Sequence, residues 1–296
     1  MYNNDNRYHD ERVNHTPIRR NRSMPSDQSA EQTLDFSLAE TYFHISPRGS
    51  DNPLFETPAV SLLQPQTMDS LLSLGRDMLR GLDLTISGSF LGLAFFGLPA
   101  AVLSFMYQYD GVLDLSLDNL TAQVESHGDH PHLVLKINEV RLKQLPETGR
   151  NEAMARELAE LFRHSVTPVI ELACARIGCK PDLVWNQFGS RMISVNEFIL
   201  QRAASEAMKD KYRQHYELLV SLAPEEFNHR KNPYVHKPRY IESAYDPQKQ
   251  VLVRSSCCMW YRKENGVKCY TCPILKDTQR EQMKLELREQ RAKASS

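Results

Sequence analysis

The sequence predicts an α+β protein that is mostly helical, with a small antiparallel hairpin and a cysteine-rich segment near its C-terminus. Three observations predict this. Apolar residues recur at helical spacing in most of 67–222, two β-rich runs flank a turn near residue 128, and four of the six cysteines lie within 257–272. A chain of 296 residues with 41% hydrophobic and 25% charged residues is long enough for a sizeable core. These values exclude a wholly disordered, collagenous or coiled-coil chain.

The N-terminal part, residues 1–55, is predicted to be a disordered tail. Its first 32 residues are polar with scattered aliphatic side chains. Such a stretch buries too little apolar area to offset an ordering entropy of about 1–2 kcal/mol per residue. Residues 33–66 carry isolated apolar positions broken by prolines, which indicates a partly ordered lead-in on the surface of an α+β domain spanning 56–253.

A helix at 67–80 and an uncharged stretch at 84–109 come next. The second is long enough to cross a bilayer, which needs about 20 apolar residues. Glycines and Pro99 interrupt it and no basic cluster follows it, which argues against a span. We expect a buried helix kinked at Pro99; contact with the surface of the inner membrane and a true span are the alternatives.

In the rest of the chain, the spacing of apolar residues changes from strand-like to helix-like and back. Two β-rich runs around the turn 126–131 predict an antiparallel hairpin, and residues 151–222 are predicted to be helical with a break at Pro168. A basic, aromatic loop at 228–245 leads to a strand at 251–254. We therefore divide the remainder into a cysteine segment at 254–275 and a charged, solvated helical tail at 276–296.

The charge balance and the number of cysteines argue against a nucleic-acid-binding protein and against a disulfide-stabilised one. Lysine and arginine number 36 against 37 acidic residues, so the balanced charge argues against a nucleic-acid partner. The first residues lack the apolar region of a secretory signal, so we expect a cytoplasmic protein. Six cysteines are too few for a disulfide scaffold, and clustered thiols in a reducing compartment are more often metal ligands than crosslinks.

The clustered thiols are Cys257, Cys258, Cys269 and Cys272, in the pattern Cys-Cys-x10-Cys-x2-Cys. Four thiolates can hold an iron–sulfur cluster or a zinc ion. Neighbouring side chains in extended chain point to opposite faces, so the first two thiols converge poorly on one ion. A two-iron cluster tolerates that divergence better, and the pattern favours it. Zinc, and thiols that are buried or form a redox pair, remain the alternatives.

The run Arg-Ser-Ser-Cys-Cys-Met-Trp-Tyr-Arg at 254–262, with Gly266 and Pro273, resembles the C-terminal signature of FhuF-like ferric-siderophore reductases. The stretch 84–120 and Asn232-Pro233-Tyr234 are similar to other parts of that family, so the resemblance covers 67–275. It implies a cytoplasmic bacterial protein whose four clustered cysteines ligate a [2Fe–2S] cluster, with no catalytic residue beyond the cluster. Serines stand at 255 and 256, where many members have arginine.

The resemblance also implies a reaction, the one-electron reduction of Fe(III) in a hydroxamate-type siderophore. Ferrous iron binds hard oxygen donors less tightly, so reduction releases it. The sequence has no glycine-rich nucleotide motif, so we expect a separate electron-donor protein. The basic residues expected to contact the siderophore or the donor are Arg230, Lys231, Lys237, Arg239, Arg254 and Arg262.

Two other functions fit the same residues, namely a zinc-stabilised module that handles siderophores without redox activity, and a ferredoxin-like electron carrier. The remaining polar and thiol groups are expected to be structural. His127, His130 and His132 are predicted to lie in an exposed turn. Cys174 and Cys179 are predicted to be core residues on different faces of one helix.

Overall fold

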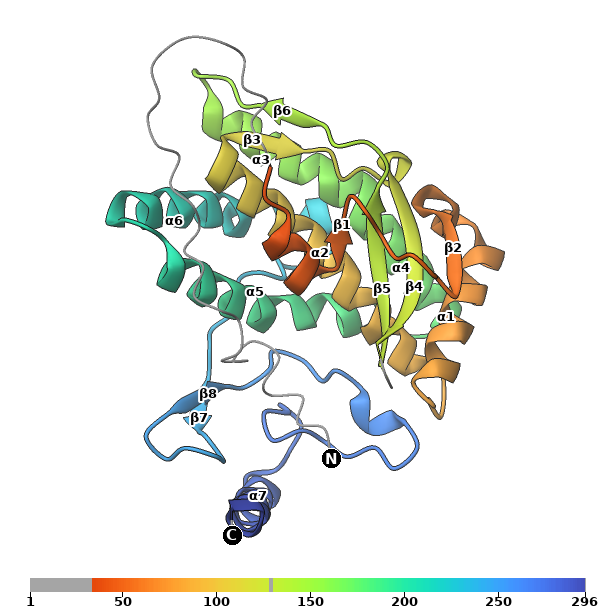
Figure 1. Ribbon diagram of the computed structural model, residues 1–296, viewed down its shortest axis with the longest axis vertical. Coiled ribbons are helices and arrows are strands. Elements are labelled where there is room, and N and C mark those ends of the chain that lie inside the picture. Colours follow the sequence, from red (N-terminus) through yellow and green to blue (C-terminus); the bar gives the residue numbers. More distant parts are fainter. Residues whose placement is uncertain (1–33, 128–129, 296) are drawn as a thin grey trace.

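The computed structural model describes residues 34–127 and 130–295 (Figure 1). Helices surround a central apolar helix, a small sheet covers one side of it, and the C-terminal region projects from one end with α7 outermost. The predicted α+β class is confirmed. The main helices and strands are introduced below, and the short 3-10 turns are Ala59–Leu63, Leu117–Asn119, Pro224–Phe227 and Trp260–Arg262.

The central helix is α2 (Thr85–Tyr109). The helices that pack against it are α1 (Pro65–Met78), α4 (Thr167–Ile177), α5 (Asp182–Arg202) and α6 (Glu206–Ser221). Among the described residues, α2 is the helix whose length and composition would allow it to cross a membrane, but 89% of its most apolar window is buried inside the protein. The expectation of a core helix is confirmed, and Pro99 lies within it.

Glycines on α2 let α4 and α5 approach closely. A Cβ atom at Gly92 would lie 2.6 Å from Cγ1 of Val184 on α5, and one at Gly88 would lie 3.1 Å from Cδ1 of Ile177 on α4. This close approach brings the residues of α5 that follow Val184 next to α2, where the site described below is built.

The sheet has the strand order β1-β5-β4-β2. Strands β4 (Leu120–His127) and β5 (His130–Ile137) form the predicted antiparallel hairpin, which is confirmed. Strand β2 (Phe55–Pro58) pairs antiparallel with β4, and β1 (Ile45–Ser46) pairs parallel with β5. A separate pair joins β3 (Gly111–Leu113) to β6 (Leu142–Gln144).

The predicted disordered tail is wrong for residues 34–55. Ala39–Phe43 form a π-helical turn, and the side chains of Phe43 and Ile45 are 2% and 0% exposed. The carbonyl of Phe43 packs so tightly on α2 that a Cβ atom at Gly97 would lie 2.7 Å from its oxygen. Residues 34–55 are interrupted by prolines and have little local apolar pattern, but some of them become buried by packing against parts of the chain that are distant in sequence. The rest of the predicted tail, 1–33, lies outside the described residues.

The helical region after the sheet follows the prediction. Helix α3 (Arg150–Leu161) runs into a π-helical turn at Phe162–Val166, and α4 begins at Thr167 with Pro168 in its first turn. Proline is tolerated there because that amide has no partner within the helix. Further on, Ser205 caps α6 by accepting a hydrogen bond from the Met208 amide at 3.2 Å.

The C-terminal region has little regular structure before its last helix. Strands β7 (Tyr240–Glu242) and β8 (Gln250–Leu252) form a short antiparallel pair, so the predicted strand at 251–254 ends two residues early. The cysteine segment then returns along the helices, and α7 (Asp277–Ser295) ends the described chain.

Candidate metal centre and adjoining cavity

The four clustered thiols meet in one group, in which Cys272 contacts both Cys257 and Cys269 and Cys258 contacts Cys269. Sγ of Cys272 lies 3.7 Å from Sγ of Cys257, and the thiols of Cys258 and Cys269 are hydrogen-bonded to each other. Two thiolates bound to one tetrahedral metal through bonds of about 2.3 Å lie about 3.8 Å apart. The separation between Cys257 and Cys272 fits that geometry, so these two thiols suit one metal ion.

This pairing explains the adjacent cysteines. Cys257 pairs with the last cysteine of the motif and Cys258 with the third, so the two neighbours point to different partners. Among the residues that the structure describes, no three His, Cys, Asp or Glu side chains form a group that could hold one ion. Adjacent cysteines that reach different partners suit a two-iron cluster, whose ligand positions are well separated.

The loop between the pairs is shaped by special backbone conformations. Met259, directly after the adjacent cysteines, has a φ of 57°, and Asn265 has a φ of 55°. A Cβ atom at Gly266 would lie 2.7–2.8 Å from three backbone carbonyl oxygens, so glycine is required at the predicted turn. The amide of Cys272 donates to the carbonyl of Cys269 at 3.0 Å, which closes the second half of the motif.

Hydrogen bonds between thiols set their acidities. The bond to Cys269, and then burial, raise the pKa of Cys258, while the nearby Arg254 guanidinium acts to lower it. The bond donated by Cys272 lowers the pKa of Cys257 and raises that of Cys272 itself. The donor thiol of each pair holds its proton in the absence of metal, so binding must release protons from the site.

The cysteine segment is attached to the helices at two places. At α5, the amide of Ser255 donates to Oγ of Ser190 at 2.9 Å, and the amide of Ser190 donates to Oγ of Ser255 at 3.0 Å. At the turn between α1 and α2, the Arg262 guanidinium pairs with Asp83, and the Leu82 amide donates to the Arg262 carbonyl at 2.9 Å. These contacts hold the thiols against one end of α2.

Helix α7 covers the second half of the motif through Arg280. This side chain is 3% exposed, and its guanidinium donates to the carbonyl oxygens of Tyr270, Cys272 and Leu275, the last two at 3.0 and 3.2 Å. The predicted helix is confirmed, but the expectation that it is wholly solvated is wrong. The burial of Arg280 could not be predicted from the sequence, because Arg280 lies in a run of charged residues and resembles its exposed neighbours.

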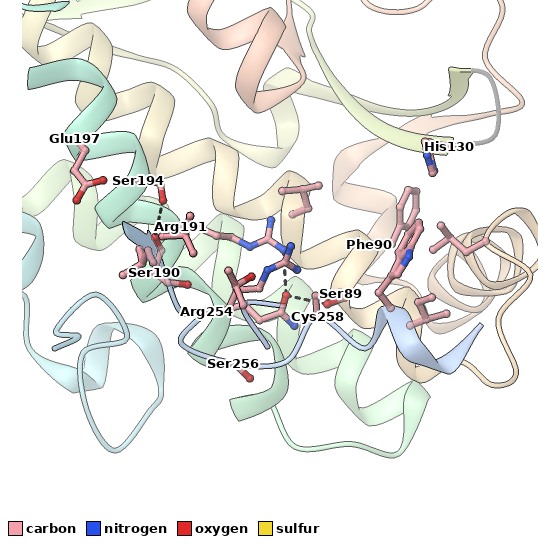
Figure 2. Close-up of a pocket in the computed structure, with 18 of the residues that line it drawn as sticks. Ser89, Phe90, His130, Ser190, Arg191, Ser194, Glu197, Arg254, Ser256 and Cys258 are labelled. Carbon is pink, nitrogen blue, oxygen red and sulfur yellow. Dashed lines mark hydrogen bonds between the residues drawn. The ribbon is translucent and has the colours of Figure 1, made fainter. Parts of the chain in front are cut away.

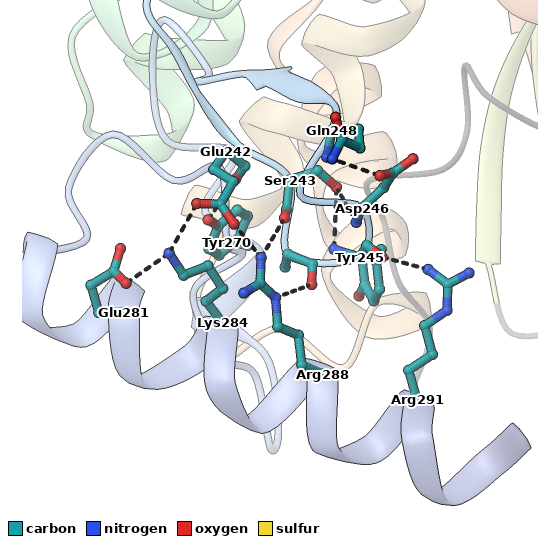
Figure 3. Close-up of polar contacts among 11 residues, drawn as sticks. Glu242, Ser243, Tyr245, Asp246, Gln248, Tyr270, Glu281, Lys284, Arg288 and Arg291 are labelled. Carbon is teal, nitrogen blue, oxygen red and sulfur yellow. Dashed lines mark hydrogen bonds and ion pairs between the residues drawn. The ribbon is translucent and has the colours of Figure 1, made fainter. Parts of the chain in front are cut away.

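The rest of α7 contacts the loop after β7, as Figure 3 shows. Lys284 and Arg288 both pair with Glu242, and Arg288 also donates to the carbonyl of Ala244 at 3.2 Å. Further along the helix, Arg291 donates to the carbonyl of Tyr245 at 2.8 Å. The helix is therefore fastened along several turns.

A cavity of about 280 Å³ opens beside Cys258 between α2, α5, β8 and the cysteine segment (Figure 2). Its size is near the lower end of small-molecule sites, at about 300 Å³. Its wall combines apolar and cationic side chains with one thiol. They include Phe90, Leu93, Arg191, Arg254, Cys258 and Trp260.

A buried amide orients one of these cations. Gln187 is 4% exposed, and its Oε1 accepts hydrogen bonds from Oγ of Ser89 at 2.8 Å and from the guanidinium of Arg191 at 3.2 Å. Its Nε2 donates to the carbonyl of Leu183 at 2.9 Å. Arg191 could not be predicted from the sequence, because nothing in the pattern of α5 separates an arginine facing a cavity from one facing solvent.

The basic residues predicted to contact a siderophore or a donor divide into two groups. Arg254 lines the cavity, and Arg262 lies in the ion pair with Asp83. The other four lie on an exposed loop and do not line the cavity; they are Arg230, Lys231, Lys237 and Arg239. Their contact with a donor protein stays a prediction.

The histidines near the hairpin turn are not all in solvent. His130 lines the cavity, with its ring centroid 5.7 Å from that of Trp260. His132 lies in a different cavity, where its Nδ1 is 3.1 Å from Nε2 of His44. The predicted exposed turn is therefore wrong for these two residues, because β5 begins earlier than its apolar run.

Comparison with known families identifies the cysteine segment. Residues 254–273 match the family model described as the FhuF 2Fe-2S C-terminal domain. The match contains all four clustered cysteines, so the resemblance of this segment is confirmed and its cofactor is a [2Fe–2S] cluster rather than zinc. A search of curated proteins found no match to the chain.

Proposed function

We propose that this chain, whose residues 254–273 form an FhuF-type [2Fe–2S] domain, is a ferric-siderophore reductase of the cytoplasm. The observation that carries the proposal is the position of Cys258, which is both a cluster ligand and part of the wall of the cavity. When bound, the cluster supplies electrons one at a time. A chelate bound in the cavity would therefore lie next to the cluster that donates the electron.

The reaction is the reduction of Fe(III) to Fe(II) in a hydroxamate-type oxygen chelate. The ferric ion gains one electron, and a separate electron-donor protein restores the electron that the reductase has lost. Ferrous iron binds hard oxygen donors less tightly, so reduction itself loosens the chelate. The chain's own task is to hold the chelate beside Cys258 and to keep the ligand loop fixed.

The described contacts support both tasks. Phe90 and Trp260 give the cavity apolar walls that exclude water from one side of a bound chelate. Arg280 holds the backbone around Cys272, so the ligands do not need to reorganise during electron transfer. We assign the exposed basic loop at 228–240 to docking of an acidic donor protein, because clustered surface charge steers association.

Anaerobic titration tests the function directly. The purified, cluster-loaded protein is reduced with dithionite, excess reductant is removed, and ferric tris(acetohydroxamate) is added in the presence of a ferrous chelator. We expect the visible absorption of the oxidised cluster to return, with about one Fe(II) trapped per protein. Failure of every ferric chelate to reoxidise the protein would contradict the reductase function and favour an electron carrier.

A further inference from the structure

We propose that the cavity beside Cys258 selects ferric chelates that carry negative charge, in particular hydroxamate chelates with free carboxylates, and that Arg191 and Arg254 bind those carboxylates. This inference rests on the reductase function proposed above and adds the charge class of the substrate.

The two arginines come from different elements and reach the same cavity. Arg191 extends from α5, Arg254 follows β8, and Figure 2 shows both guanidinium groups projecting into the cavity near Cys258. Glu197 is the lining carboxylate, and it accepts a hydrogen bond from the Tyr240 hydroxyl at 2.6 Å. Arginine side chains therefore outnumber carboxylates on the described wall.

A buried side chain holds the guanidinium of Arg191, and a backbone hydrogen bond fixes the main chain at Arg254. Gln187 accepts from the Arg191 guanidinium and is itself fixed by Ser89 on α2. The amide of Arg254 donates to the carbonyl of Thr271 at 3.0 Å, one residue before the last cysteine. Groups fixed in advance lose little freedom when a ligand binds, so they bind it more tightly.

The charge of the cluster makes the two lining arginines necessary for an anionic ligand. Four thiolates and two sulfides outweigh the charge of two ferric ions, so the cluster with its ligands is itself negative and would repel anions beside Cys258. A ferric tris-hydroxamate is uncharged and feels no such repulsion. A chelate with extra carboxylates does feel it, and the two guanidinium groups that line the cavity would offset it.

The shape of the cavity fits this assignment. About 280 Å³ is too small to enclose a whole siderophore, so the cavity receives one arm or one face of it. A guanidinium group binds a carboxylate through two parallel hydrogen bonds, which would orient that arm. Phe90 and Leu93 would contact its methylene groups.

Two matched probes test the inference. Ferric tris(acetohydroxamate) is neutral, and ferric tris(succinate monohydroxamate) has the same iron-binding oxygens with three added carboxylates. Stopped-flow reoxidation of the dithionite-reduced protein gives a rate constant for each. We expect the charged probe to react about tenfold faster at low ionic strength, with the advantage shrinking in high salt.

Arginine variants assign the effect to the cavity. We expect Arg191→Gln and Arg254→Gln each to slow the charged probe about tenfold while changing the neutral probe less than about twofold. Arg213→Gln, an exposed position on α6, is the matched control and should change neither rate. The neutral probe also reports any change in the redox centre caused by Arg254.

The outcomes separate the two proposals. Equal rates for both probes in the unmodified protein, or equal slowing of both by the arginine variants, would overturn the charge selection and leave the reductase function standing. Reoxidation by neither probe would instead contradict the reductase function, and the charge selection with it.

Discussion

The adjacent positions of Cys257 and Cys258 influence which metal centre the site can hold. Side chains of neighbouring residues diverge, so two adjacent thiols are poor ligands for one ion but good ligands for two. The structure pairs each of them with a different cysteine of the second half of the motif. The four cysteines were singled out by spacing and resemblance, and their role as ligands stays a prediction; their contacts with one another required the folded loop.

Replacing Cys258 or Cys272 with serine should remove the cluster and leave the fold. Cys272 is one of a few buried residues in a small apolar group that is separate from the main core. We expect loss of iron, sulfide and visible absorption, with little change in the far-ultraviolet circular dichroism.

The matched control is Cys174→Ala. Cys174 is buried in the main core, where its thiol hydrogen-bonds to Cys179, just past the end of α4. The two thiols meet, contrary to their predicted separation, because Gly178 turns the chain back with a φ of 76°. Loss of the cluster in this variant would contradict the ligand assignment.

His215 should make stability depend on pH. Burial, with help from Lys211 and Arg150, lowers the pKa of this histidine from 6.5 to about 4. Between those values the unfolded chain binds the proton and the folded chain does not, so stability falls as pH drops from 6.5 towards 4. The loss reaches about 3 kcal/mol. The free energy of unfolding, measured by urea titration at several pH values in this range, should depend less steeply on pH in His215→Gln. An unchanged pH dependence would contradict the role of His215.

At the scale of elements, α7 matters more than its composition suggests. Arg280→Ala would leave three carbonyl groups around the last cysteine without their donor, and hydrogen bonds to a charged group contribute about 1.5–3 kcal/mol each. We expect the variant to lose its cluster several-fold faster to an iron chelator, measured by bleaching. Gln282→Ala, on an exposed turn of the same helix, is the control; equal bleaching rates would show that α7 does not hold the ligands.

The elements that the sequence predicted are those whose pattern is local. The apolar run of α2, the hairpin β4–β5 and the break at Pro168 depend on spacing within a few turns. Strand β1 and the docking of α7 depend on contacts with distant parts of the chain, such as the packing of Phe43 on Gly97. Local propensity does not include such contacts. For that reason the predicted end of the N-terminal tail at residue 55 and the predicted solvation of the C-terminal helix were wrong.

The same reasoning applies to the site. The cysteine motif is continuous in sequence and was found, together with Arg254. The cavity is discontinuous, since Ser89, Gln187 and Arg191 come from two helices that are adjacent only after folding. The basic side chains of the loop at 228–240 were predicted as contacts, yet Arg230, Lys231, Lys237 and Arg239 do not line the cavity.

The whole molecule consists of a large core and a smaller apolar group around the cysteines. The contacts that attach the smaller part include the serine pair Ser190–Ser255 and the half-exposed ion pair of Arg262 with Asp83. Exposed ion pairs contribute little, about 0–1 kcal/mol. We therefore expect the cysteine segment to open at a lower free energy than the main core.

Heating the loaded protein should reveal this order. We expect the visible absorption of the cluster to disappear several degrees below the loss of helical circular dichroism at 222 nm, because the smaller apolar group has fewer buried contacts. Both signals are recorded on one sample during one temperature ramp. Coincident transitions would show instead that the cluster is integral to the main cooperative unit.

The crossed pairing of thiols has a consequence for digestion by trypsin. Held by thiols from both halves of the motif, a cluster would close residues 257–272 into a ring that contains Arg262, Lys263 and Lys268. Without the metal the ring is open, and a backbone that opens locally reaches the extended form that a protease requires. Iron starvation would thereby mark the unloaded protein for cleavage at the loop whose ligands it has failed to fill.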